Sequence, residues 1–146
     1  MTSRNDAEVE KLLRHIASVA VDDPVAADAL LWDWIGHTPT PAGEVRMRDL
    51  ALLAPRLVAD EVNRAGWGGQ GGDMWALTRP LGEELPPAVE AASQAVIRHL
   101  NGEPDVADEI VDAYAGPRGV AGLWDVGTAS LRLLAAELRD QRSDHQ

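Results

Sequence analysis

Apolar residues recur at helical spacing along most of the chain. In the first segment Val9, Leu12, Leu13 and Ile16 follow the i, i+3, i+4, i+7 pattern of a helix that buries one face. Alternation of apolar and polar residues, which is typical of strands, nowhere exceeds three or four positions. A length of 146 residues suits one domain. The pattern therefore predicts an all-α fold, a single-domain bundle of five to six helices.

Capping residues, prolines and glycines set the expected helix bounds. Asp23 precedes Pro24, an arrangement typical of an N-cap followed by the first helical residue, and Gly36 is suited to end that helix. Together with the periodicity, these signals predict helical segments over approximately 6–20, 24–35, 46–65, 87–101, 104–115 and 119–141, with 142–146 as a frayed tail.

Three positions carry more specific expectations. The segment 37–43 contains two prolines and a glycine, which favours a loop, and Pro55 predicts a kink or a fresh start inside the third helix. Gly127 falls on the apolar stripe of the last segment, where the missing side chain would let another helix pack closely. Because that stripe is the broadest in the chain, we expect the last helix near the centre of the bundle.

Composition excludes several classes of function. The chain has no cysteine, which excludes disulfides, thiolate metal sites and cysteine nucleophiles. Its formal net charge of −11 opposes binding to nucleic acid and to anionic membranes. No apolar run approaches the length of a membrane span, and the N-terminal residues lack the pattern of a signal peptide. We therefore expect a cytoplasmic protein with no nucleic-acid or membrane partner.

A glycine-rich run lies at the middle of the chain. Five of the 13 glycines fall within seven residues, without the preceding strand or the lysine of a phosphate-binding loop. Two interpretations stay open, namely a ligand lid or partner-docking loop between two tryptophans, or a long linker that the tryptophans anchor. The candidate ligand or partner loop consists of Gly66, Trp67, Gly68, Gly69, Gln70, Gly71, Gly72, Asp73 and Trp75.

Acidic residues gather in the fifth segment. Glu109 and Asp112 have the spacing with which two helices can share magnesium in phosphohydrolases, but such a site needs a second acidic pair at i, i+3 or i+4. The close acidic pairs Glu8/Glu10, Asp60/Glu61 and Glu83/Glu84 lack this spacing. A solvated acidic face near a helix N-terminus is the simpler interpretation, so we expect no metal and no cofactor.

Local motifs of catalysis are absent. The four histidines are scattered, with no metal-binding spacing among them, and no Gly-x-Ser-x-Gly motif occurs. A catalytic triad assembled by the fold stays open, yet no residue is assigned as catalytic and the sequence favours a protein without enzymatic activity.

Trp32 is the candidate interface residue. It lies about 200° around its helix from Trp34, which belongs to the apolar stripe, so both rings cannot face one core. Either a neighbouring helix covers Trp32, or the ring contacts another molecule, since tryptophan is enriched in interface hot spots.

Three functions follow from these observations, in order of preference. The first is an acidic helical protein that acts by protein–protein interaction, as a regulator, adaptor or immunity-type factor, with a protein partner or a second copy as a homodimer. The second is a small-molecule receptor or enzyme whose interhelical pocket is covered by residues 66–75. The third is a magnesium-dependent phosphohydrolase that uses Glu109 and Asp112.

Overall fold

The computed structural model describes residues 4–37, 40–64 and 85–144, and every regular element in these ranges is an α-helix. This confirms the all-α prediction. None of the helices in these ranges has an apolar stretch that could traverse a bilayer. The helices are α1 (Arg4–Asp22), α2 (Pro24–Ile35), α3 (Pro41–Arg64), α5 (Pro87–Leu100), α6 (Pro104–Ala115) and α7 (Val120–Asp144).

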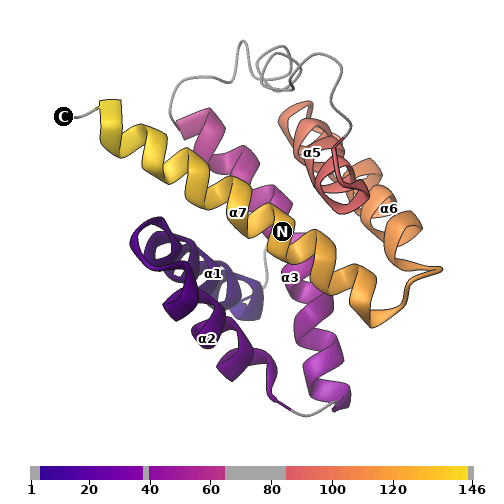
Figure 1. Cartoon of the computed structure of the whole chain (residues 1–146). Helices are drawn as coiled ribbons and strands as arrows, with labels where there is room; N and C mark the ends of the chain where they lie inside the picture. The colour runs from indigo at the N-terminus through magenta and orange to yellow at the C-terminus, as the bar shows by residue number, and fades with distance from the viewer. Residues whose placement is uncertain (1–3, 38–39, 65–84, 145–146) are drawn as a thin grey trace.

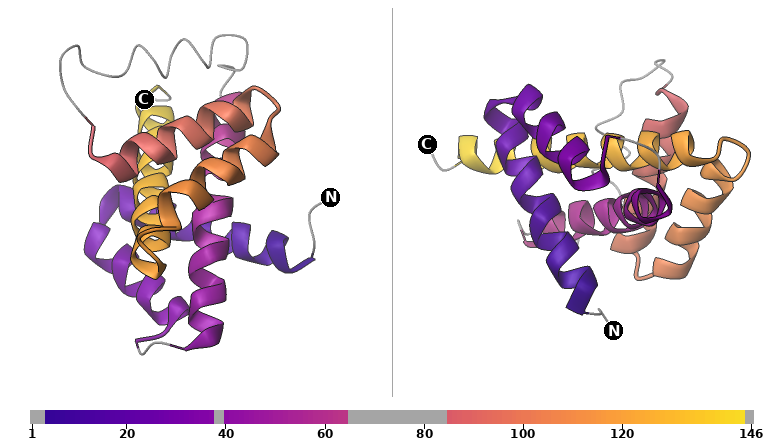
Figure 2. Two further views of the ribbon diagram at one scale, coloured as in Figure 1. Left: turned by 90° about the vertical axis from the view of Figure 1, so that its right-hand side faces the viewer. Right: turned by 90° about the horizontal axis from the view of Figure 1, so that it is seen from below.

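Two long helices, α3 and α7, form the centre of the bundle. They share the most extensive packing of any helix pair, and α7 also contacts α1, α5 and α6. The pairs α1–α2 and α5–α6 lie on opposite sides of α7 (Figures 1 and 2). The expectation that the last helix lies at the centre is therefore correct.

The close approach of α3 and α7 depends on a glycine. A Cβ atom at Gly127 would lie only 2.3 Å from the Cγ atom of Leu50, a fully buried residue of α3. Since real Cβ contacts are much longer, the glycine is what allows Leu50 to occupy this space. The expectation for Gly127 is confirmed.

The core has two parts. The larger part joins α1, α2, α3 and α7 around leucines such as Leu13, Leu31, Leu57 and Leu134. The smaller part joins α3, α5, α6 and α7 and is built mostly of alanines. Small side chains let helix axes approach one another closely, and larger residues such as Ile110 and Tyr114 pack at the margin of this part.

The expected start and end of α2 are both observed. The side chain of Asp23 accepts a hydrogen bond from the backbone N–H of Ala26 at 3.0 Å, and Pro24 is the first helical residue. Gly36 follows the helix with φ of 102°, a conformation that glycine adopts without strain.

The structure corrects two expectations based on proline. Helix α3 begins at Pro41 rather than near 46, because the hydroxyl of Thr40 accepts a hydrogen bond from the backbone N–H of Gly43 at 2.9 Å and so caps the helix. Residues 41–43, expected in a loop, are helical. No fresh start occurs at Pro55, which lies buried within the continuous helix α3, and the alternative expectation of a kink there stays a prediction. Burial of the surrounding apolar face outweighs the single hydrogen bond that proline removes.

The terminal helices are longer than the periodicity predicts. Helix α1 extends from Arg4 to Asp22, and α7 continues to Asp144, so most of the expected tail 142–146 belongs to a helix. Polar residues carry no periodic apolar signal, and helix ends made of them are therefore hard to place from sequence.

Candidate functional site

Helix α2 is apolar on two faces. Its inner face is formed by Ala27, Leu31 and Ile35, which are buried in the larger core. Its outer face carries Val25, Ala29 and Trp32, of which Val25 is 79% exposed and Trp32 40% exposed. These three residues follow i, i+4, i+7 spacing and form one stripe, which we call the outer stripe. The exposed carboxylates Asp28 and Asp33 border this stripe, which therefore faces outward between two polar positions.

Trp32 ends the outer stripe against α7. Its ring centroid lies 4.6 Å from that of Trp124, with an angle of 31° between the ring planes. His37 also stacks on Trp32, with ring centroids 6.5 Å apart, and its Nε2–H donates a hydrogen bond to the carboxylate of Asp33 at 3.0 Å. A neighbouring helix therefore covers part of Trp32, while the rest of the ring stays exposed. Its role as an interface residue stays a prediction.

A groove of about 320 Å³ lies between α1, α2 and α7, and its lining includes Asp28 of α2 but no residue of the outer stripe. We call it the α2–α7 groove. Its lining spans Pro24 to Leu31 on α2 and Thr128 to Arg139 on α7, and Arg139 donates a hydrogen bond to the backbone carbonyl of Val21 at 3.4 Å. Most of its wall is made of small and branched apolar side chains, namely Ile16, Ala17, Ala20, Pro24, Ala27, Leu31, Leu131, Ala135 and Ala136.

The two edges of the groove carry opposite charges. Asp28 lines it from α2, whereas Arg132 and Arg139 line it from α7. Asp28 and Arg132 are both exposed, and neither makes a hydrogen bond or ion pair with another residue in the part of the chain that the structure describes. Both groups are thus available to a molecule that enters the groove. The outer stripe and the groove with its charged edges together make up what we call the α2–α7 face.

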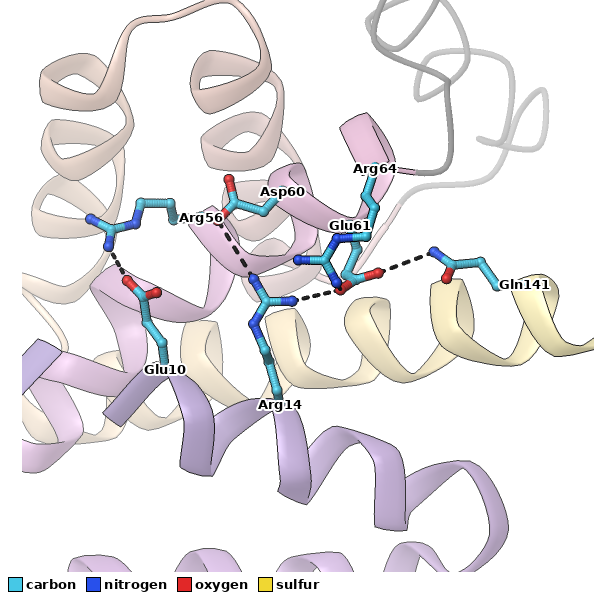
Figure 3. A network of polar contacts seen from close by, with 7 residues as sticks. All are labelled: Glu10, Arg14, Arg56, Asp60, Glu61, Arg64 and Gln141. Carbon is cyan, nitrogen blue, oxygen red and sulfur yellow. Dashed lines mark hydrogen bonds and ion pairs between the residues drawn. The ribbon is translucent and has the colours of Figure 1, made fainter. Parts of the chain in front are cut away.

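A second polar cluster lies at the junction of α1, α3 and α7 (Figure 3). Its centre is Glu61, which is only 3% exposed. One carboxylate oxygen accepts hydrogen bonds from Arg14 of α1 at 2.5 Å and from Arg64 at 2.8 Å, and the other accepts from Gln141 of α7 at 3.2 Å. Arg14 also pairs with Asp60 at 3.7 Å. The buried carboxylate is thereby satisfied, and it joins three helices.

A cavity of about 400 Å³ lies beside this cluster. Its polar lining consists of Arg14, Ser18, Glu61, Arg64 and Gln141, and Leu134 and Leu138 complete the wall. Arg64 is the last residue described before the glycine-rich run. The donors and the acceptor of the cluster already bond to one another, so the cavity has no buried polar group left without a partner among the described residues.

The acidic helix does not gather a metal site. Asp112 forms a two-pronged ion pair with Arg48 of α3, at 3.0 and 3.3 Å, while Glu109 is exposed. Burial raises the pKa of the nearby Asp108 carboxyl, and the charges of Asp112 and Asp105 raise that pKa further. Within the described residues no three His, Asp or Glu side chains converge as metal ligands. The magnesium hypothesis therefore has no second ligand pair there, and it stays a prediction.

The glycine-rich run lies outside the described residues. The candidate ligand or partner loop, from Gly66 to Asp73 with Trp75, therefore stays a prediction, and so does its role as a lid.

Comparison with protein-family models, with curated proteins and with solved structures finds no match to this chain.

Sequence reasoning did not find the Glu61 cluster or the charged groove. A signal for Glu61 was present, because it follows Leu57 by four residues and Val58 by three and so falls on the apolar face of its helix. An acid on an apolar face must find a partner when it is buried. The groove has no comparable signal, since α2 and α7 are about 100 residues apart in sequence.

Proposed function

We propose that this protein acts by protein–protein interaction through the α2–α7 face, as a regulator, adaptor or immunity-type factor. One observation carries the proposal, namely that the outer stripe of α2 stays exposed although the inner face of the same helix is buried. An exposed apolar stripe, on a helix whose opposite face is buried, is typical of a surface that a second protein covers.

The chemistry of the face supports a macromolecular partner. Tryptophan beside an apolar groove is typical of interface hot spots, and charged groups at the groove edges give orientation and specificity. The net charge of −11 favours a protein over a nucleic acid as the partner. A cytoplasmic location, expected from the sequence, belongs to the same proposal and can be tested by cell fractionation.

Photo-crosslinking tests this proposal whichever protein the partner is. Benzoylphenylalanine replaces Ala29 of the outer stripe, or the equally exposed helical Ala113 of α6 as a matched control. After irradiation of the cells from which the protein originates, we expect discrete adducts from position 29 and none from position 113. Adducts from neither position, or the same adducts from both, would contradict the proposal.

A small-molecule site is the second candidate function, and the cavity beside Glu61 favours it. Its volume of about 400 Å³ falls within the range of ligand pockets, and polar and apolar side chains share its lining. The test is the melting temperature of the protein in metabolite mixtures, compared with that of Ser18→Leu, which fills the cavity. A ligand that stabilises the wild type but not the variant would support this candidate. No stabilisation by any mixture would oppose it.

A further inference from the structure

We infer that the partner on the α2–α7 face is a second copy of this chain, which binds by two-fold symmetry. The inference rests on the proposed function and names the molecule that covers the face.

Shape is the first reason. The face contains a ridge, formed by the outer stripe, and a groove whose α2 wall lies further around the same helix, with the exposed Asp28 between the two. A two-fold interface uses the same patch on both subunits, so the patch must complement itself. A ridge next to an apolar groove meets that requirement, because each copy can insert its ridge into the groove of the other.

Charge complementarity is the second reason. The α2 edge of the groove is acidic at Asp28, and the α7 edge is basic at Arg132. The two side chains line the same groove without pairing with each other or with any other residue among those described. When α2 of one copy lies in the other copy's groove, Asp28 can meet the partner's Arg132. Symmetry forms the same pair a second time. Another protein would need to supply both charges in the matching order, whereas a second copy already has them.

The net charge of the chain determines the salt concentration and the control variants that a test of self-association needs. Two chains of −11 repel each other at long range, which opposes any self-association. At about 0.15 M salt this repulsion is screened beyond about 8 Å, so contacts within the interface decide the outcome. Substitutions must also be compared with controls that change the net charge equally.

The experiment is sedimentation equilibrium of the full chain from about 1 to about 100 µM, the range in which micromolar dissociation constants are measurable. The wild type should show a concentration-dependent mass that rises to twice that of one chain. Val25→Asp should weaken the dimer at least about tenfold, since it places a charge in the apolar contact. Its matched control is Val106→Asp, an exposed valine near the start of α6, which should leave the dimer unchanged.

Charge reversal tests the pairing itself. Asp28→Arg and Arg132→Asp should each weaken the dimer about tenfold, and the double variant should restore it to within about threefold of the wild type. Glu109→Arg and Lys11→Asp, which change the net charge equally at exposed positions, should have no such effect. Circular dichroism of every variant establishes that the fold is retained.

Three results would overturn the inference. They are a wild type that stays monomeric over the whole range, a dimer that resists Val25→Asp, and a double reversal as weak as its single variants. A monomeric wild type would leave the proposed function standing, because crosslinks from position 29 to a different protein would still support it. The absence of crosslinks from position 29 would contradict the proposed function, whatever the sedimentation experiment shows.

Discussion

Leu50 of α3 occupies the space that a side chain at position 127 of α7 would need. The Cγ atom of Leu50 lies 2.3 Å and its Cδ2 atom 2.7 Å from the position of a Cβ on Gly127. Both residues are fully enclosed, so neither can move into solvent. The contact fixes the spacing of the two helices on which the other helices of the described residues pack.

Gly127→Ala should destabilise the protein, although alanine is the better helix former. The helix preference favours alanine by about 1 kcal/mol, whereas overpacking a rigid core costs about 1 to 3 kcal/mol and this contact is especially short. We expect a net loss of about 1 to 2 kcal/mol in the free energy of unfolding, measured by urea denaturation.

Leu50→Ala provides the matching control. Alone it should cost about 2 to 5 kcal/mol, because it leaves a cavity. In the double variant the new methyl group enters that cavity, so the combined loss should be smaller than the sum by at least about 0.5 kcal/mol. Additive losses would show that the two residues do not compete for the same space.

The buried carboxylate of Glu61 should contribute more to the stability of the protein than its exposed partner Arg64. Glu61→Ala leaves Arg14 without its principal counterion, and since the Arg14 side chain is 29% exposed we expect a loss of about 2 to 3 kcal/mol. Arg64→Ala removes a partner that is 66% exposed and should cost less than about 1 kcal/mol. Urea denaturation compares the two variants. Equal losses would mean that Glu61 does not hold the three helices together.

Local patterns predicted much of the fold. The cap at Asp23, the end at Gly36 and the close approach at Gly127 follow from backbone requirements that the sequence displays directly. The predicted loop at Pro41 and the predicted fresh start at Pro55 were wrong, because both rules describe a proline in isolation. In the protein a threonine cap and a buried apolar face decide these positions.

Long-range contacts could not be predicted in the same way. Arg14 is 47 residues from Glu61, and Trp32 meets Trp124 across an even larger separation. No periodicity in one segment specifies its neighbour in the fold, so the polar cluster and the α2–α7 groove emerged only from the packing. Trp32 was singled out because it lies off the stripe, which is a local signal.

Stability should fall as the pH is lowered below about 6.5, in part through His99. Burial lowers the pKa of His99, and the positive charge of Arg56 lowers that pKa further, while Asp60 opposes the shift. The unfolded chain therefore takes up a proton near pH 6.5 that the folded chain resists. The contribution of His99 to the free energy of unfolding is complete above pH 6.5. It is lost as the pH falls towards the lowered pKa of His99. His99→Gln should flatten this part of the curve of unfolding free energy against pH.

Asp108, in contrast to His99, should lower the free energy of unfolding at neutral pH. Because its pKa is raised, chiefly by burial, the folded chain holds a proton that the unfolded chain releases from about pH 3.8 upward. The ionised carboxylate therefore destabilises the fold at neutral pH. Asp108→Asn should raise the free energy of unfolding at pH 7 by less than about 1 kcal/mol, since solvent screens this half-buried group. The gain should shrink as the pH approaches 3.8. A loss of stability at pH 7 would contradict this assignment.

The most direct test of the central claim is the protection of Trp32 inside cells. Hydroxyl radicals oxidise tryptophan according to its exposure, and 40% of Trp32 is exposed in the isolated chain. Oxidation of Trp32 is measured by mass spectrometry relative to that of Tyr114 on α6, in intact cells and in dilute purified protein. If a protein covers the α2–α7 face, the ratio should fall severalfold in cells. An equal ratio in both would show that the face stays uncovered and would contradict the proposed function.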